Sequence, residues 1–156
     1  MSIRRTGGRV GKALVVLSLV LTGTMATTGQ ASASPANCSS WPSPAGATNK
    51  SIGAEVRLDA QNSGHAGYVA LSFGTLKNNR RAGWARLTGS YEVGYKFWFD
   101  VSSTRGNGWI QCGPFTYVTE KPNYTPAHYT SADPNLVFRA CGKSPYYPQS
   151  QCTGWY

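Results

Sequence analysis

Residues 91–112 read YEVGYKFWFDVSSTRGNGWIQC, and this stretch decides the fold. Between residues 95 and 102, large apolar residues alternate with polar residues and one tryptophan. The odd-numbered set is Tyr95, Phe97, Phe99 and Val101. The even-numbered set is Lys96, Trp98, Asp100 and Ser102. A period of two is typical of a half-buried β-strand, so we expect the odd set to face a core and the even set to face solvent.

A glycine-rich turn follows this strand, and a second strand then ends at Cys112. Pairing Phe97 with Ile110 also sets Trp98 opposite Trp109, so that each face of the hairpin keeps one character. A slip of one residue would mix the two faces, because successive side chains point to opposite sides. The pattern therefore predicts a β-hairpin with this register.

The turn itself, residues 102–109, reads SSTRGNGW. It resembles a degenerate Asp-box, the Ser-x-Asp-x-Gly-x-Thr-Trp hairpin of sialidase propellers and other secreted β proteins. Ser102, Gly106 and Trp109 match that motif, whereas Thr104 and Gly108 occupy its aspartate and threonine positions. In those families the motif shapes a turn and is not catalytic, so the resemblance implies a hairpin and no glycosidase activity.

The start of the chain has the pattern of a secretory signal peptide. Four basic residues precede an apolar run at 13–21, which is too short to span a bilayer, and Ala-Ser-Ala at 31–33 is a cleavage site. A second possible site lies at 34–36. The residues after Arg4-Arg5 do not fit a twin-arginine signal, so we expect export by the general secretory route, cleavage after Ala33 and an extracellular location.

The charge of the chain depends on whether this leader is counted. The whole sequence carries a formal net charge of +9, but four of its 15 Lys and Arg residues and none of its six acids lie in the first 33 residues. The rest therefore carries +5, which favours weak attraction to anionic polymers. The sequence contains no recognition helix and no basic run, so no nucleic-acid partner is expected.

The four cysteines all follow the leader, at Cys38, Cys112, Cys141 and Cys152. An even number of cysteines in an exported chain predicts two disulfides, and no Cys-x-x-Cys spacing indicates a metal or redox site. Three pairings are possible. We prefer Cys38–Cys112, which ties the N-terminal segment to the sheet, and Cys141–Cys152, which closes a local loop.

Three regions are expected: a signal peptide at 1–33, a Ser/Pro/Ala-rich segment at 34–51, and a β domain at 52–156. Alternating strands are predicted at 54–58, 66–73, 81–89, 95–101, 110–112 and 136–141, with a last short strand within 151–156. Short strands separated by turns about every ten residues favour an all-β fold. The sequence predicts a small antiparallel β-sandwich or barrel with two disulfides, and does not decide between them.

Three segments resemble small secreted actinobacterial proteins of unassigned function. They are RAGWARL at 81–87, GNGWIQCGPF at 106–115, and FRACG at 138–142 with QCTGWY at 151–156. The likeness implies secretion and a β fold, and it implies no reaction. Many of these proteins have a cysteine where this chain has Asn79, so their disulfide scheme need not transfer.

Little in the sequence favours catalysis. No nucleophile elbow and no metal-ligand spacing occurs, and we expect no catalytic residue, metal or cofactor. His65 and His128 are expected to be solvated loop residues. The acids Glu55, Asp59 and Asp100 have outward parity and are expected to be surface charges.

Aromatic residues favour a binding function instead. If residues 84–89 pair with 93–98, Trp84, Trp98 and Trp109 form an outward row across three strands, flanked by Arg86, Lys96 and Gln111. Such a row could stack on sugar rings of a cell-envelope or environmental polymer. The same residues could equally be a structural aromatic ladder.

Two loops are further candidates. Residues 119–134 form a long Pro- and Tyr-rich loop, and long loops are often functional. Residues 142–151 would present Tyr146 and Tyr147 between prolines, closed by the second disulfide, as an inhibitor presents a loop to a secreted hydrolase. The leading prediction is polymer binding; the alternatives are an inhibitor of a secreted hydrolase and a small extracellular hydrolase.

Overall fold

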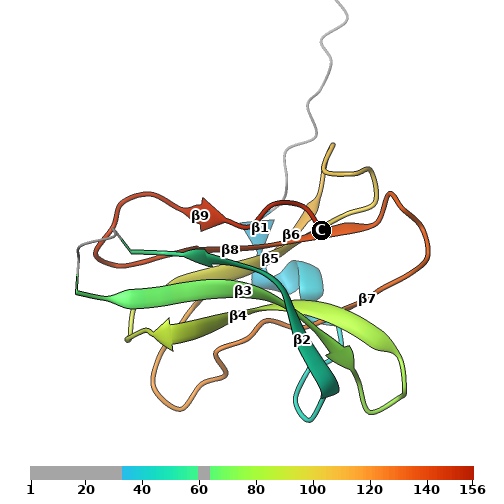
Figure 1. Ribbon diagram of the computed structural model, residues 1–156, viewed down its shortest axis with the longest axis horizontal. Coiled ribbons are helices and arrows are strands. Elements are labelled where there is room, and N and C mark those ends of the chain that lie inside the picture. The colour runs from blue at the N-terminus through green and yellow to red at the C-terminus, as the bar shows by residue number, and fades with distance from the viewer. Residues whose placement is uncertain (1–32, 60–63) are drawn as a thin grey trace, which may run out of the picture.

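The computed structural model describes residues 33–59 and 64–156. The signal-peptide prediction and part of the turn at 61–64 thus lie almost wholly outside the described residues. Two β-sheets pack face to face as a sandwich, in which β8 and β5 lie above β3 and β4 in Figure 1. The fold is therefore the predicted all-β class, and it is the sandwich form. No helix among the described residues is long and apolar enough to cross a membrane.

The larger sheet has five strands. Its order is β1 (Ala33–Ser34), β6 (Ile110–Thr116), β5 (Lys96–Ser102), β8 (Val137–Lys143) and β9 (Gln151–Cys152). The smaller sheet has four strands. Its order is β2 (Thr48–Arg57), β3 (Ala66–Thr75), β4 (Arg81–Ser90) and β7 (His128–Tyr129). A short 3₁₀ helix, η1 (Pro35–Cys38), follows β1.

The core lies between the sheets and contains Tyr95, directly before β5, and the odd-numbered residues of β5. Tyr95 and Phe99 have no exposed surface, Phe97 is 1% exposed and Val101 is 6% exposed, as the alternation predicts. β3 and β4 supply the opposite wall, which includes the buried side chains of Val69, Leu71, Phe73 and Leu87. Burying a large apolar side chain of this kind stabilises the fold by roughly 1.5–3 kcal/mol.

The even-numbered residues of β5 do not all face solvent. Lys96 is exposed and Trp98 is half-buried, but Asp100 and Ser102 are 0% and 1% exposed. The prediction of a solvent face was therefore wrong at this end of the strand. The two residues do point away from the core, but other parts of the chain cover them.

The register of the β5–β6 hairpin also differs from the prediction. Ile110 lies opposite Val101, and Cys112 lies opposite Phe99, so the pairing is shifted by four residues. The parity is the same, because the shift is even. The turn is wider than the predicted register implies, because eight residues, 102–109, separate the paired residues Val101 and Ile110. Within it the Ser102 hydroxyl accepts hydrogen bonds from two turn amides, including Gly106 N at 2.9 Å.

β4 and β5 were predicted to be neighbours, but they lie in different sheets. β4 pairs with β3 and β7, whereas β5 pairs with β6 and β8. The chain between them turns at Gly94, whose φ of 99° suits glycine, and crosses from one sheet to the other. A turn that connects two sheets and a hairpin turn within one sheet have similar residues, so the sequence pattern did not show that β4 and β5 belong to different sheets.

β6 contains a bulge at Gly113 and Pro114. Between the pairs Phe97–Phe115 and Phe99–Cys112, β6 uses one residue more than β5 does. Proline cannot donate a backbone hydrogen bond, so it is tolerated at a bulge. The bulge re-aims the end of β6, which contributes Phe115 and Thr116 to the surface described below.

Both predicted disulfides are present. Cys38 is bonded to Cys112 and Cys141 to Cys152, with Cα–Cα distances of 5.3 Å and 4.0 Å. The first joins η1 to β6, and the second joins neighbouring strands β8 and β9. No cysteine among the described residues is free.

Candidate functional site

An aromatic groove lies where the N-terminal segment meets the end of β6 and the loop after it. Three aromatic side chains line it: Trp41, Phe115 and Tyr124. The remaining lining residues are Ser43, Pro44, Thr116, Lys121, Pro122 and Pro126, and the groove encloses about 400 Å³. The surface it offers is mostly apolar, with hydroxyls and one ammonium at its margin.

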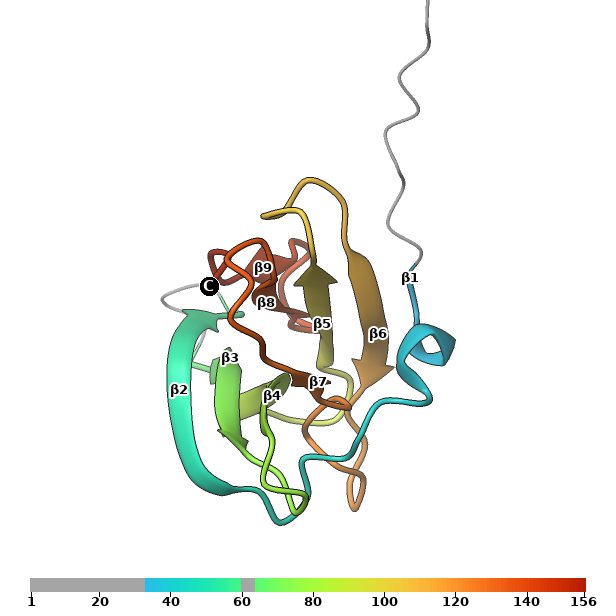
Figure 2. The same cartoon turned by 90° about the vertical axis from the view of Figure 1, so that its right-hand side faces the viewer.

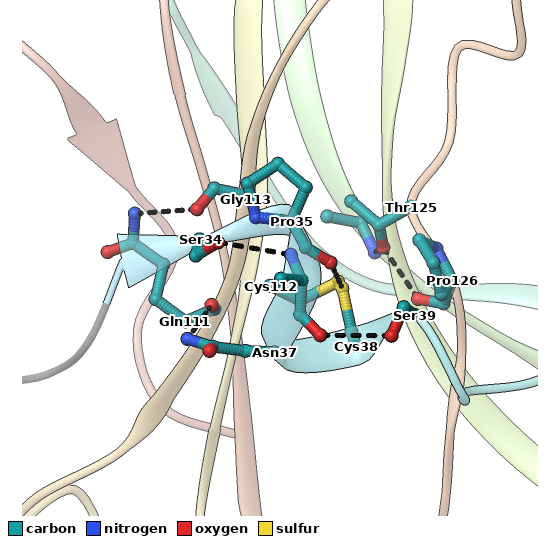
Figure 3. Close-up of a disulfide and its surroundings, with 12 residues drawn as sticks. Ser34, Pro35, Asn37, Cys38, Ser39, Gln111, Cys112, Gly113, Thr125 and Pro126 are labelled. Carbon is teal, nitrogen blue, oxygen red and sulfur yellow. Dashed lines mark hydrogen bonds between the residues drawn. A yellow bond between two sulfur atoms is a disulfide. The ribbon is translucent and has the colours of Figure 1, made fainter.

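One wall of the groove is fixed by the first disulfide. Figure 3 shows η1 bonded through Cys38 to Cys112 on β6, with the side-chain amide of Asn37 donating to the Gln111 carbonyl at 3.3 Å. The chain then turns, and the Trp41 amide donates to the Cys38 carbonyl at 3.0 Å. The indole is half-buried and packs edge-on against Phe99, with ring centroids 6.2 Å apart. It is therefore held in a fixed orientation.

The opposite wall is the loop that leads to β7. Figure 2 shows the N-terminal segment leaving η1 and passing this loop before it enters β2. The Ala127 amide donates to the Pro42 carbonyl at 2.8 Å, and the Thr125 amide donates to the Ala85 carbonyl at 2.9 Å. Asn123 donates to the Leu87 carbonyl at 3.0 Å. The loop is thus bonded both to the N-terminal segment and to β4, so the groove is preformed.

A second hollow, of about 380 Å³, lies at the same end of the five-stranded sheet. It is lined by Lys96 and Lys143 on the strands and by the loop at residues 144–148. Lys96, Tyr146 and Tyr147 were all predicted binding residues, and the structure brings them together here. Lys143 was not predicted, because its position opposite Lys96 depends on the β5–β8 register.

Tyr146 is 53% exposed, yet it is not free of the domain. Its ring stacks on His65 with centroids 4.3 Å apart, and its hydroxyl donates to Glu92 at 2.8 Å. This hydrogen bond to Glu92 raises the pKa of Tyr146 above its ordinary value. His65 also lies 3.5 Å from Glu92, so the expectation of a merely solvated histidine was wrong.

The predicted row of three indoles is not formed. Trp84 lies on β4 of the four-stranded sheet, and it is 3% exposed. Residues of the N-terminal segment and of the loop before β7, including Ala47 and Ala127, cover it. Trp98 lies on β5 of the other sheet and Trp109 directly precedes β6, and both are half-buried. Trp84 and Arg86 instead line a separate shallow hollow of about 250 Å³.

Trp109 takes part in a closed cluster rather than an open platform. Arg139 lies between Trp109 and Trp155, with its guanidinium carbon 5.0 Å and 4.4 Å from the two ring centroids. The guanidinium donates two hydrogen bonds to Asp100 Oδ2, at 2.6 Å and 3.1 Å. The cluster covers Asp100, and this explains why a residue of outward parity is buried.

The electrostatics of Asp100 reflect this burial. Desolvation raises the pKa of Asp100, and the hydrogen bonds and charge of Arg139 offset only part of that effect. Among the described residues, Asp100 Oδ1 has no hydrogen-bond partner. The carboxylate is thus held by one guanidinium and is closed off from solvent.

Asp59 was predicted to be a surface charge, and this too was wrong. It is 6% exposed and accepts hydrogen bonds from the Tyr95 hydroxyl and the Gly67 amide, each at 2.8 Å. Burial raises the pKa of Asp59, but hydrogen bonds from Ser144, Tyr95 and Gly67 outweigh that effect and lower it overall. Burial, together with the bond to Asp59, raises the pKa of Tyr95 to about 12.

His128 is half-buried rather than solvated. It packs on Trp41 and Phe138, with ring centroids 4.9 Å and 5.9 Å away. Burial lowers the pKa of His128, which therefore stays neutral near pH 7. No group of three or more His, Cys, Asp or Glu residues suited to hold a metal ion occurs in the described part of the chain.

In comparisons with known proteins, no family model, no curated sequence and no solved structure matches this chain. The functional residues must therefore be judged from the geometry. Sequence reasoning missed Trp41, Phe115 and Thr116 as site residues. The signal that could have found the groove is the pairing of Cys38 with Cys112, since it brings Trp41 to the end of β6.

Proposed function

We propose that this chain is an exported, non-catalytic β domain that binds a polysaccharide of the cell envelope or the environment. The observation that carries the proposal is the preformed groove of Trp41, Phe115 and Tyr124. Its volume of about 400 Å³ lies within the range of roughly 300–1,000 Å³ that is usual for small-molecule sites. The binding surface differs from the indole row that the sequence predicted.

The chemistry of the groove suits a sugar. Rigid aromatic faces can cover the apolar faces of pyranose rings, and they lose little conformational entropy on binding. Ser43, Thr116 and Lys121 at the margin can hydrogen-bond sugar hydroxyls. The two walls are held by a disulfide and backbone hydrogen bonds, so little ordering is needed when a ligand binds.

The groove offers no catalytic apparatus. Among the described residues that line it, none is a carboxylate or a histidine. Asp59 and Asp100 are buried in hydrogen bonds to their own domain and lie outside the groove lining. Hydrolysis of a glycosidic bond generally requires two carboxyl groups that flank the bond, so binding is the better proposal.

The inhibitor alternative is less well supported. An inhibitory loop offers its side chains to the partner enzyme, whereas Tyr146 is stacked on His65 and bonded to Glu92. The Tyr147 hydroxyl donates to Gln149 within the same loop. Slow-binding inhibition of a secreted protease that is lost with Tyr146→Ala would favour the inhibitor over the polysaccharide-binding proposal.

The test is retention of the purified protein on insoluble polysaccharides and in affinity gels that contain soluble ones. We expect Trp41→Leu to weaken binding at least tenfold, which corresponds to about 1.4 kcal/mol. Trp98→Leu is the matched control, since Trp98 is half-buried and does not line the groove. Near-ultraviolet circular dichroism checks that both variants keep the fold.

Equal loss of binding by both variants, or loss with Trp98→Leu alone, would contradict the groove. Retention that neither variant changes would also contradict it. If the protein binds no glycan but binds a proline-rich peptide, and Trp41→Leu abolishes that binding, the groove is the binding site and its ligand is not a polysaccharide.

Export is a separate part of the proposal. The two disulfides favour an oxidising compartment. When the full chain is expressed in a secreting bacterial host, we expect it in the medium with Ser34 as its first residue. N-terminal sequencing of the protein from the medium measures this. Accumulation inside the cell with an intact leader would contradict it.

A further inference from the structure

The second hollow has an unusual charge arrangement. Lys96 on β5 and Lys143 on β8 lie directly opposite each other across the sheet. Side chains in such a pair have Cβ atoms about 4.5–5.5 Å apart, and like charges there destabilise a sheet. Neither lysine forms an ion pair within the described part of the chain. An uncompensated pair of ammonium groups at the rim of a hollow is suited to bind an anion.

Four of the six acids of the chain have partners in other segments of the domain. Asp59 and Asp100 are buried, and Glu92 is bound by Tyr146. Glu55 accepts a hydrogen bond from Thr88 on the other sheet. The remaining acids, Glu120 and Asp133, are exposed. Among the described residues, no acid forms an ion pair with Lys96 or Lys143, although Glu92 accepts its hydrogen bond from Tyr146, which lines the hollow.

The hollow adjoins the aromatic groove. Thr116, which lines the groove, is the cross-strand partner of Lys96, and Lys96 is the partner of Lys143. The three residues form one row across β6, β5 and β8. Strands lie about 4.8 Å apart, so the row extends about 10 Å from the margin of the groove. Lys121 lies at the groove itself.

We propose that the hollow binds the acid groups of an acidic polysaccharide whose sugar rings occupy the groove. This inference rests on the polysaccharide-binding function proposed above and specifies its substrate class. The lysine ammonium is a compact point charge and can bind either a carboxylate or a phosphate ester. Tyr147 and Tyr146 line the same hollow beside the lysine pair.

The experiment compares acidic oligosaccharides with neutral forms of the same backbone. The carboxylate arm uses oligogalacturonate and oligomannuronate with their methyl esters. The phosphate arm uses a glycosylated glycerol-phosphate polymer and the free glycoside. Affinities are measured by titration calorimetry at low and high salt. The variant is Lys96→Gln with Lys143→Gln, and the matched control is Lys50→Gln with Lys77→Gln, since both of those lysines are exposed and lie outside the groove and this hollow.

We expect the wild type to bind at least one acidic oligomer tenfold or more tightly than its neutral form at low salt. The double lysine variant should lose that preference and keep the affinity for the neutral form. The control variant should keep both. The arm that shows the preference identifies carboxylate or phosphate as the acid group.

Two results separate failure of this inference from failure of the proposed function. Equal affinity for acidic and neutral forms, with binding still lost in Trp41→Leu, overturns the inference and leaves polysaccharide binding intact. Binding to no member of a panel of acidic and neutral glycans overturns both. Tighter binding to DNA or to anionic vesicles, abolished by the double lysine variant, overturns the polysaccharide as the source of the acid group.

Discussion

The outer face of the five-stranded sheet has two ends that differ in charge. Both are built from cross-strand pairs of β5 and β8, with Trp98 and Cys141 between them. At one end Asp100 lies opposite Arg139, and two tryptophans cover the pair. At the other end lysine lies opposite lysine and the pair borders an open hollow. One backbone arrangement thus carries a neutralised, closed pair and an uncompensated, open one.

This difference separates structural charges from functional ones. In a buried ion pair each charge is compensated by the other, so neither charge is available to a ligand. A like-charged pair at a surface contributes nothing favourable to the fold. Its charge is available to a partner, and complementary charge gives specificity and a faster association. The comparison can be tested by changing each end in turn.

The largest effect is expected at the closed end. Arg139→Met leaves the Asp100 carboxylate buried and unpaired, which should lower the free energy of unfolding by about 3–5 kcal/mol. Urea denaturation at pH 7 measures it. Lys143→Met is the matched control, since it is on the same face of the same strand and should change stability by less than about 1 kcal/mol. Equal losses for the two variants would contradict the comparison.

The same variant has a predicted pH dependence. Burial raises the folded-state pKa of Asp100 above its unfolded value, so the folded state binds its proton more readily. Stability contributed by this group therefore increases as the pH falls through the folded pKa. A protonated Asp100 needs no guanidinium, so the loss in Arg139→Met should be smaller near pH 4 than near pH 7. A loss that grows towards low pH would contradict the assignment.

The fold was largely predictable from the sequence. The alternation along 95–101 determines which side chains point inward, and an even number of cysteines, four, allows only three ways to form two disulfides. The closed end was not predictable. Asp100 has the parity of a surface residue, but it is buried beside Arg139, which lies between Trp109 and Trp155 from two different segments. The same limit applies to Trp84, which loops distant in sequence cover. The odd or even position of a residue along a strand predicts which side of the sheet its side chain faces. Whether a side chain on the outer side is buried depends on which other segments pack over it.

The next effect concerns the disulfide that lies between the two ends. Replacing Cys141 and Cys152 with alanine removes the constraint on an 11-residue separation, which should cost about 3 kcal/mol in the chain-entropy model. The loop at 144–148 would then be less ordered, so we also expect weaker binding of acidic oligosaccharides. Urea denaturation and calorimetry measure the two effects. An unchanged unfolding free energy would show that strand pairing alone holds β9.

A smaller effect is expected beneath the open end, where Tyr95 donates to Asp59. Tyr95→Phe removes a hydrogen bond to a buried carboxylate and should cost about 1.5–3 kcal/mol at pH 7. The pKa of Tyr95 is raised from 10.0 to about 12, so its contribution is present below pH 10 and is lost as the pH rises towards 12. The difference between wild type and variant should shrink over that interval. Denaturation at several alkaline pH values measures it, and a constant difference would contradict the assignment.

The smallest effect, and the one of opposite sign, is expected at the open end itself. Lys143→Glu places a carboxylate opposite Lys96 and converts a repulsive pair into an attractive one, so the unfolding free energy should rise by roughly 0.2–1 kcal/mol. Lys77→Glu is the control, because Lys77 is exposed in a turn and its replacement should change stability little. The stabilised variant should nevertheless lose its preference for acidic oligosaccharides. A gain in stability that accompanies a loss of binding is the result expected if the lysine pair is retained for a ligand. If stability falls while the preference survives, the lysine pair contributes to the fold and the contrast between the two ends does not hold.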